Sequence, residues 1–188
     1  FFANIDHNIL LTVLKQRTED KDILALLEFF RGSVCTDLHR SDLCNERKGL
    51  PLGNLTSQLL VNIYMNEFDQ WVKHELKMKY YIRYADDFVF LSDDKNFLEV
   101  VQQKVGDFLT HRLKLSLHPD KVFIKTLASG VDFLGWVHFP YHKVLRTVTK
   151  KRMFRKVNEK NITSYLGLLS HGNANKLSRV LVDSQFLV

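Results

Sequence analysis

The 188-residue sequence predicts an α+β fold in which helices cover one face of an antiparallel sheet. Several stretches repeat apolar residues at helical spacing, and others are rich in the aromatic and β-branched residues typical of strands. In the core these stretches follow the order helix, hairpin, helix, strand, strand. With 45% apolar and 12% aromatic residues, the chain can bury a core of ordinary size. No internal repeat or low-complexity segment interrupts it.

The first fifty residues predict two helices and a loop. Asp6 can cap a helix over 7–17. A second helix is predicted over 20–30, ending at Gly32, and a short strand and loop over 33–47. The range 48–54 is rich in Gly and Pro and is predicted to be a loop.

The middle of the chain predicts a hairpin between two long helices. The first helix spans 55–76, and the hairpin spans 79–91 with Ala85, Asp86 and Asp87 at its polar centre. Asp94 can cap the second helix, over 97–112. The residues that recur at helical spacing in the first helix are Leu55, Leu59, Ile63, Phe68, Trp71 and Val72. Those expected to point inward from the second are Phe97, Val100, Val101, Val105, Phe108 and Leu109.

The rest of the chain predicts further strands and then helices. A strand and turn are expected over 113–123 and a strand over 131–139. A domain boundary is predicted at 140–143, where the composition changes. The range 146–187 should be mostly helical, with a break at Gly172.

Charge is unevenly divided across that boundary. Residues 141–188 carry ten Lys and Arg against two acidic residues, whereas residues 1–140 carry 17 against 19. A near-neutral body with a basic C-terminal segment suggests a catalytic core joined to a nucleic-acid grip. On charge alone, a solvated basic helix fits as well.

The cysteines and the N-terminal residues indicate the cellular compartment of the protein. Cys35 and Cys44 have no CxxC spacing, and no signal peptide precedes them, so we expect a reduced, cytoplasmic protein with no zinc site. No apolar stretch is long enough for a transmembrane helix. The chain opens on two aromatic residues without a Met, which suggests a fragment.

Asp86 and Asp87 are the strongest candidates for chemistry. Adjacent carboxylates repel each other, although turns favour Asp, so an ordinary polar turn is the alternative. Ile82 and the run Phe88–Leu91 are apolar, which predicts buried strands leading to the pair. Carboxylates in that place suit a hard divalent cation, Mg²⁺ or alternatively Mn²⁺. Two such ions can clamp the attacking and leaving oxygens of a phosphoryl transfer.

The string YYIRYADDFVFLS, which contains Tyr84-Ala85-Asp86-Asp87, resembles the YxDD box of reverse transcriptases. The likeness is to the bacterial branch of group II introns and diversity-generating retroelements. The resemblance implies a polymerase palm of RRM/ferredoxin-like layout over 1–140, lacking its N-terminal strand and the fingers. Residues 141–188 would begin a helical, basic thumb.

Other motifs follow in the family's order. The string KGLPLGNLTSQ resembles the loop and helix start that line the incoming nucleotide and the template base, and its Ser-Gln ending resembles that of diversity-generating retroelement enzymes. Gly49 and Gly53 let backbone approach a ligand, and a helix N-terminus near Asn54 offers unpaired N–H groups. The resemblance implies nucleotide or template contacts from Phe2, Leu52, Gly53, Asn54, Ser57, Gln58 and Tyr84.

The resemblance also implies sites farther along. Lys121 would lie near the leaving pyrophosphate as a general acid, with a surface lysine as the alternative. The VDFLGW string resembles the primer grip, which would comprise Phe133, Leu134, Gly135 and Trp136. Without the resemblance, Phe133, Leu134 and Trp136 would be interpreted as core. Thumb contacts to the nucleic-acid backbone would come from Lys150, Lys151, Arg152, Arg155 and Lys156.

The family's first catalytic Asp would lie four residues before Phe1. We therefore expect residues 1–188 alone to be inactive and the full-length protein to be an RNA-directed DNA polymerase. Its partners would be an RNA template, a DNA or RNA primer and dNTPs, with an accessory protein or a structured cognate RNA as further candidates and no membrane. The alternatives are a non-catalytic, maturase-like RNA-binding module, a palm-type polymerase that makes RNA or works without a template, and a degenerate remnant.

Overall fold

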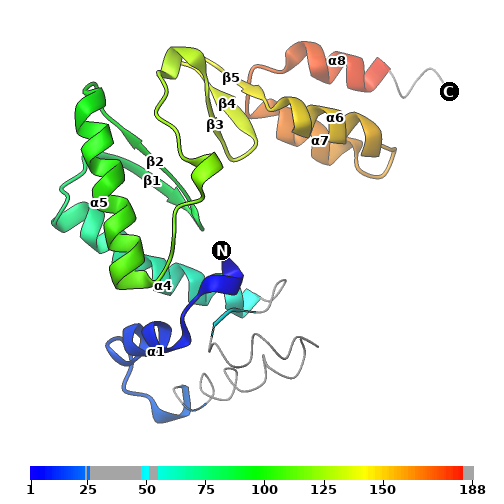
Figure 1. The fold of residues 1–188 in the computed structure, drawn as a ribbon. Coiled ribbons are helices and arrows are strands. Elements are labelled where there is room, and N and C mark those ends of the chain that lie inside the picture. The colour runs from blue at the N-terminus through cyan, green and yellow to red at the C-terminus, as the bar shows by residue number, and fades with distance from the viewer. Residues whose placement is uncertain (24, 26–47, 51–54, 184–188) are drawn as a thin grey trace. The chain divides into compact units, whose positions relative to one another are not determined.

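The computed structural model describes residues 1–23, 25, 48–50 and 55–183 (Figure 1). They form two compact units, Phe1–Ile124 and Lys125–Val188. The predicted α+β class is confirmed, but the antiparallel strands form two separate sheets, one of two strands and one of three. The predicted boundary at 140–143 falls within the second unit, between two paired strands, and the division into palm and thumb remains a prediction.

The first unit begins with a short 3-10 helix, Phe2–Asn4, and helix α1, His7–Lys15. The predicted cap is confirmed, because the Asp6 carboxylate accepts hydrogen bonds from the backbone N–H groups of Asn8 (2.9 Å) and Ile9 (3.2 Å). Of the helix predicted over 20–30, only residues 20–23 and 25 are described, and residues 21–23 and 25 are helical. The strand and loop predicted over 33–47 lie outside the described residues.

Helices α4, Leu55–His74, and α5, Lys95–Leu113, confirm the two long helices of the prediction. Asp94 caps α5 by accepting from the backbone N–H groups of Asn96 (2.8 Å) and Phe97 (3.2 Å). At the other end of α5, Lys114 adopts a left-handed conformation with a φ of 50°. That conformation ends the helix.

Parts of the predicted apolar faces are wrong. Leu55 and Leu59 of α4 are exposed, because the buried face of this helix follows Leu60, Val61, Tyr64, Met65, Phe68 and Val72. Phe97 and Val100 of α5 are exposed as well. Phe97 lies one turn before the first buried residue of α5, and Val100 lies beside the buried line, which comprises Val101, Val105, Phe108, Leu109 and Leu113.

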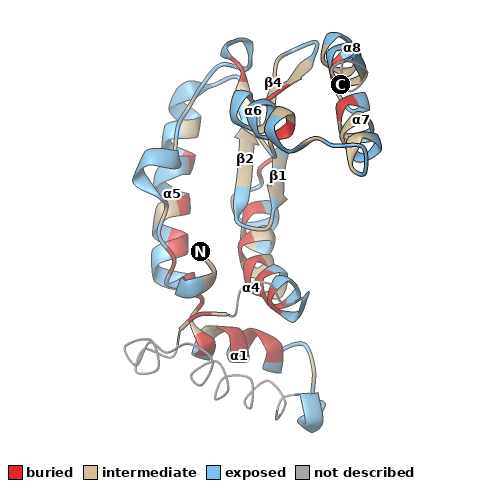
Figure 2. Cartoon of the chain, turned by 90° about the vertical axis from the view of Figure 1, so that its right-hand side faces the viewer, coloured by how far each residue is buried: buried red, intermediate tan, exposed pale blue. Residues whose placement is uncertain are grey.

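Strands β1, Tyr80–Tyr84, and β2, Asp87–Leu91, form the predicted hairpin with Tyr84 paired to Asp87. One face packs on α4 and α5, where the Phe68 ring lies 5.0 Å from Phe88 and 5.8 Å from Phe108 (Figure 1). Figure 2 shows the buried residues of α5 turned toward the hairpin. The prediction of buried strands is wrong for the other face, where Ile82 is 58% exposed.

The segment after α5 has no strand, contrary to the prediction for 113–123. It forms a 3-10 helix at Pro119–Lys121 instead. Pro119 has no N–H to donate to a ladder, and the His118 ring accepts from the backbone N–H of Asp120 at 3.3 Å, so local bonds replace strand pairing.

The second unit packs a three-stranded sheet on three helices. A 3-10 turn at Leu127–Ser129 precedes β3 (Val131–Phe133), β4 (Trp136–His138) and β5 (Lys143–Leu145), which pair in that order. The helices are α6 (Thr147–Lys156), α7 (Ile162–Ser170) and α8 (Asn175–Asp183). The predicted helical character and the break at Gly172 are confirmed, and a further break separates α6 from α7. The buried core comprises Trp136, Leu145, Met153, Leu169, Ala174 and Leu181.

No described helix is long and apolar enough to cross a membrane.

Candidate active site

The β1–β2 turn presents two adjacent carboxylates. Ala85 and Asp86 form the two-residue connection between Tyr84 and Asp87, which pair across the strands. Ala85 has a φ of 52°, a left-handed conformation that costs an L-residue roughly 1–2 kcal/mol. Asp86 and Asp87 are exposed, and among the described residues neither carboxylate has a hydrogen-bond or salt-bridge partner. The turn therefore leaves both carboxylates available to a ligand.

Arg83 fixes the backbone of this turn. Its Nη1 donates to the carbonyl oxygen of Ala85 at 2.7 Å. Its Nε and Nη2 donate to the two carboxylate oxygens of Asp69 on α4, at 2.8 and 2.5 Å. The Tyr81 hydroxyl donates a hydrogen bond to the same carboxylate at 2.7 Å. Nη1 of Arg83 also donates to Asn62 Oδ1 at 3.3 Å. We call these four residues, Arg83, Asp69, Tyr81 and Asn62, the Arg83 network.

The electrostatics of the network favour the charged pair. Burial alone would raise the pKa of Asp69, but the hydrogen bonds from Arg83 and Tyr81 outweigh it and hold that pKa below its usual value. The hydrogen bond to Asp69 raises the pKa of Arg83. Burial, together with the bond to Asp69, raises the pKa of the Tyr81 hydroxyl. All three groups therefore keep the protonation states that make the network.

The described start of the glycine-rich loop, residues 48–50, lies against the N-terminal segment. His7 Nε2 lies 2.5 Å from the carbonyl oxygen of Gly49. The backbone N–H of Gly49 donates to Ile5 at 2.9 Å, and that of Leu50 donates to Phe2 at 3.0 Å. Gly49 has a φ of 98°, which a side chain would strain. The half-buried Phe2 is thus bonded through its backbone to the start of the loop, and the nucleotide contact predicted for Phe2 remains a prediction.

The remaining predicted nucleotide or template residues are only partly described. Leu52, Gly53 and Asn54 lie outside the described residues. Ser57 is buried, and its Oγ has no hydrogen-bond partner among the described residues, whereas Gln58 is exposed one position later on α4. Tyr84 is exposed on the open face of the hairpin.

The carboxylates of Asp86 and Asp87 suit a divalent cation, although two side chains do not make a complete set of metal ligands. Two unpaired carboxylates are the oxygen ligands that Mg²⁺ prefers. No group of three or more His, Cys, Asp or Glu side chains able to hold a metal occurs in the described part of the chain. Asp86 and Asp87 could therefore supply two ligands, and the rest would come from substrate, water or other residues.

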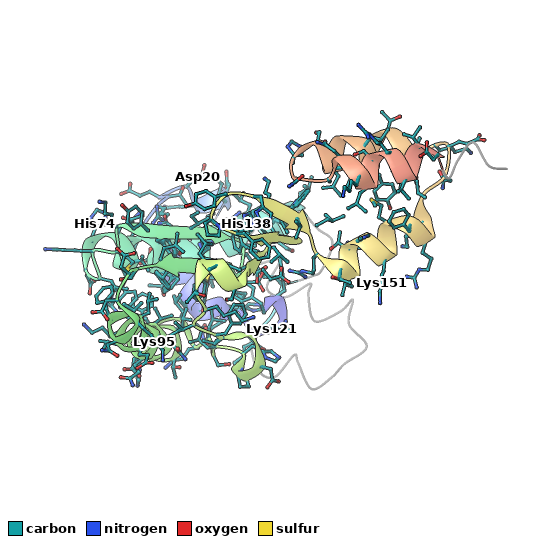
Figure 3. All side chains as sticks on the ribbon, turned by 90° about the horizontal axis from the view of Figure 1, so that it is seen from above. Asp20, His74, Lys95, Lys121, His138 and Lys151 are labelled. Atoms are coloured by element: carbon teal, nitrogen blue, oxygen red, sulfur yellow. The ribbon has the colours of Figure 1, made fainter. Side chains whose placement is uncertain are left out.

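Lys121 lies in the 3-10 helix after α5, with an exposed side chain (Figure 3). Its backbone N–H donates to His118 at 3.0 Å. This placement agrees with a surface lysine and leaves the predicted general acid untested.

The predicted primer grip forms the β3–β4 hairpin of the second unit. Leu134 and Gly135 make its two-residue turn with φ values of 53° and 82°. The Gly135 carbonyl accepts from the backbone N–H of Arg146 at 2.9 Å, and the Arg146 side chain pairs with Asp132. Leu134 is exposed at the tip, whereas Trp136 is 8% exposed and belongs to the core. Trp136 therefore packs within the unit, and Leu134 is the part of the grip open to a ligand.

Helix α6 presents the predicted basic residues to solvent. Lys150, Lys151, Arg152, Arg155 and Lys156 are all exposed, and Figure 3 labels Lys151 on this helix. Met153 is buried on the opposite side. Lys151, Arg152 and Arg155 lie on one face of the helix. That face has the charge and exposure needed to contact phosphates.

Residues 1–138 match the family described as "Reverse transcriptase (RNA-dependent DNA polymerase)". This chain belongs to the reverse transcriptase family. The match includes the YADD turn, the Arg83 network and the β3–β4 hairpin, so the resemblance noted in the sequence is confirmed.

Relatives of this reverse transcriptase-family chain include two bacterial proteins. It is 26% identical to "Protein YkfC" of Escherichia coli K12 over 84% of this chain and 48% of that protein. It is 22% identical to "Group II intron-encoded protein LtrA" of Lactococcus lactis subsp. cremoris, over 89% of this chain and 37% of that protein. A yeast "Putative COX1/OXI3 intron 2 protein" is 28% identical over 42% of this chain. The chain spans about half or less of these relatives.

Sequence reasoning missed the residues that contact the YADD turn of this family member. Arg83 lies within the YIRYADD string and Asp69 within an ordinary helical repeat, and neither residue was predicted to belong to the site. A signal was available, because Arg83 is the sole charged residue of a strand otherwise made of Tyr and Ile. An arginine there needs an acidic partner on the neighbouring helix.

Proposed function

We propose that this chain is the catalytic part of an RNA-directed DNA polymerase whose metal ligands are Asp86 and Asp87. The observation that carries the proposal is the pair of exposed, unpaired carboxylates on a turn fixed by Arg83, in a chain of the reverse transcriptase family. Adjacent acidic side chains repel each other, and a divalent cation would relieve that repulsion.

The proposed reaction is attack of the primer 3′-hydroxyl on the α-phosphate of a dNTP, with pyrophosphate leaving. Mg²⁺ held by Asp86 and Asp87 would polarise the phosphate oxygens and offset the charge that develops on them. Lys121 would donate a proton to the departing oxygen. Phe2 would pack against the sugar of the incoming nucleotide, where a bulky ring disfavours a 2′-hydroxyl. Gln58 would contact the template or nucleotide.

The two parts of the chain would divide the work. Residues 1–140 would form the palm and 141–188 the start of the thumb. Phe133, Leu134 and Gly135 would hold the primer end, with Trp136 supporting them from the core. The exposed face of α6 would contact the nucleic-acid backbone, which fixes register without reading sequence. The RNA template, primer and dNTPs would be handled in the cytoplasm.

Primer extension tests this function. The full-length protein, an RNA template, a DNA primer, dNTPs and Mg²⁺ should give extension. Asp86→Asn and Asp87→Asn should each reduce it to background, because each removes the charge of a metal ligand. Asp93→Asn is the matched control, since Asp93 is an exposed aspartate just past β2. Undiminished extension by the Asp86 and Asp87 variants would exclude this metal site.

Residues 1–188 alone are expected not to extend a primer, because no third acidic ligand is grouped with Asp86 and Asp87 in the described part of the chain. Template-dependent extension by this segment would overturn that expectation. Incorporation of rNTPs in preference to dNTPs by the full-length protein would favour an RNA-synthesising polymerase instead.

A second candidate is a non-catalytic RNA-binding module. The exposed basic face of α6 favours it, because that face needs no carboxylates to bind phosphate. RNA binding that survives the Asp86 and Asp87 substitutions, in a full-length protein that never extends a primer, would favour this candidate.

A further inference from the structure

The single side chain of Arg83 binds three different acceptors. It holds the Asp69 carboxylate through two parallel bonds of 2.8 and 2.5 Å, it donates to the Ala85 carbonyl at 2.7 Å, and it reaches Asn62 at 3.3 Å. The Arg83 side chain is 10% exposed and that of Asp69 27%. The planar guanidinium can meet all three acceptors only in one orientation.

The acceptors belong to two elements. Asn62 and Asp69 are seven residues apart on α4, so they lie two turns apart on the same side of the helix. Ala85 belongs to the β1–β2 turn. Arg83 thus ties the turn to the helix whose first residues include Ser57 and Gln58.

The β1–β2 turn needs a hydrogen bond that holds its backbone in place. Ala85 is held in the left-handed region at a φ of 52°, which a non-glycine residue leaves readily unless its surroundings hold it. The Ala85 carbonyl and the Asp86 nitrogen share one peptide plane. A donor that fixes this carbonyl therefore also fixes the positions of the nitrogen and Cα of Asp86, from which the side chain leaves the backbone.

We infer that Arg83 is a positioning residue, which Asp69 orients and which holds the Ala85 peptide so that Asp86 and Asp87 bind a divalent cation together. The inference rests on the proposed function, because it assumes that these carboxylates hold the metal. The simpler alternative is an ion pair that stabilises the fold and leaves metal binding untouched.

Metal binding and stability can be measured separately. The probe is Mn²⁺, whose free concentration in a titration of the full-length protein is followed by electron paramagnetic resonance. Thermal unfolding of the same samples reports stability. Arg83→Lys keeps the charge but cannot make the paired bonds and the carbonyl bond together. The triple variant Asp69→Leu, Tyr81→Phe, Arg83→Met keeps Asn62 and replaces the other three residues of the network with apolar groups of similar size, which often preserves stability.

The positioning role predicts that both variants bind Mn²⁺ about tenfold more weakly, the effect expected of residues that orient metal ligands. The triple variant should keep its unfolding midpoint within a few degrees. Glu67→Gln is the control, because Glu67 on the same helix pairs with Arg17 at 3.4 Å in a partly exposed position outside the Arg83 network. It should leave Mn²⁺ binding unchanged.

Wild-type Mn²⁺ affinity in a folded triple variant would overturn the inference. If the triple variant does not fold, Arg83→Lys is the deciding variant. Unchanged Mn²⁺ affinity in Arg83→Lys would then overturn the inference. The double variant Asp86→Asn, Asp87→Asn separates the two proposals. Wild-type affinity in this double variant would reject the proposed metal site and the inference with it. Lost affinity there, combined with unchanged affinity in the Arg83 variants, would reject the inference alone.

Discussion

At the scale of single residues, Asp69 shows how the chain keeps a charge under partial burial. Burial opposes its ionisation, but Arg83 and Tyr81 donate three hydrogen bonds to its carboxylate and lower its pKa. A depressed pKa in the folded state means that ionised Asp69 stabilises the fold. That contribution is present above the ordinary aspartate pKa of about 3.9 and is lost as the pH falls through the lower pKa of the folded state.

The pH dependence of unfolding should show this contribution. Asp69→Asn is expected to lower the unfolding midpoint at pH 7, and the difference from wild type should shrink below about pH 4, where the unfolded state takes up the proton first. Asp93→Asn, at an exposed position, should show little difference at either pH. A midpoint difference for Asp69→Asn that stays constant down to pH 2 would contradict the role of its ionisation.

The residues of the site were predictable only where local sequence decides them. Asp86 and Asp87 follow from the polar centre of a hairpin, and their place at the turn could be predicted before any packing was known. The pairing of Arg83 with Asp69 depends on how β1 meets α4. Fourteen positions separate them, and no periodic pattern links a strand residue to a helix residue.

At the scale of elements, helix ends were predicted better than helix faces. Asp6 and Asp94 cap their helices because the cap involves only neighbours in sequence. Exposure of Leu55 and Phe97 could not be foreseen, because each lies near the start of its helix, where burial depends on which other element reaches it. The exposure of Ile82 has the same cause, since α4 and α5 pack on the opposite face of the hairpin.

The end of α5 offers a test of backbone strain. Lys114 adopts a φ of 50° at the helix end, so Lys114→Gly should raise the free energy of unfolding by about 0.5–1 kcal/mol. Lys104→Gly, at an exposed interior position of the same helix, should lower it by about 1 kcal/mol. Chemical denaturation of the two variants measures both. Destabilisation by both substitutions would show that Lys114 contributes more through its side chain than it costs in strain.

Packing of β4 on the α7–α8 connection can be tested at Gly172. A Cβ at this position would lie 2.1 Å from Cζ3 of Trp136, whose ring is buried in the core. Gly172→Ala should therefore destabilise the second unit by about 1–3 kcal/mol through overpacking. Gly167→Ala is the control, because no atom lies within 4 Å of a Cβ there and the residue is in α7. It should be neutral or stabilising by up to about 1 kcal/mol.

At the scale of the whole chain, composition located the basic segment but not the edge of the compact unit. The charge changes near residue 141, whereas the second unit begins at Lys125. Trp136 and Leu145 explain the difference, since they are strand residues that share one core with α6, α7 and α8. Which core a strand joins is decided by packing, and net charge carries no information about packing.

The basic face of α6 leads to a prediction about salt. Removing one side chain that binds a phosphate should reduce the slope of log affinity against log salt by about 1. Replacing Lys151, Arg152 and Arg155 with Ala should therefore weaken binding of an RNA–DNA duplex by the full-length protein and flatten its salt dependence by about 3. The weakening should be similar for duplexes of different sequence, because backbone contacts do not read bases.

A lower net charge of the whole protein could also weaken binding of the duplex. A variant that loses the same charge elsewhere separates this explanation from direct contacts by α6. Replacing Lys95, Lys104 and Arg112 with Ala removes the same charge from exposed positions of another helix, α5. Since long-range attraction is screened within about 10 Å at 0.1 M salt, these residues should matter little unless they touch the duplex. Fluorescence anisotropy across a range of salt concentrations measures both slopes. Equal weakening in the two variants would mean that overall charge, and not the face of α6, accounts for binding.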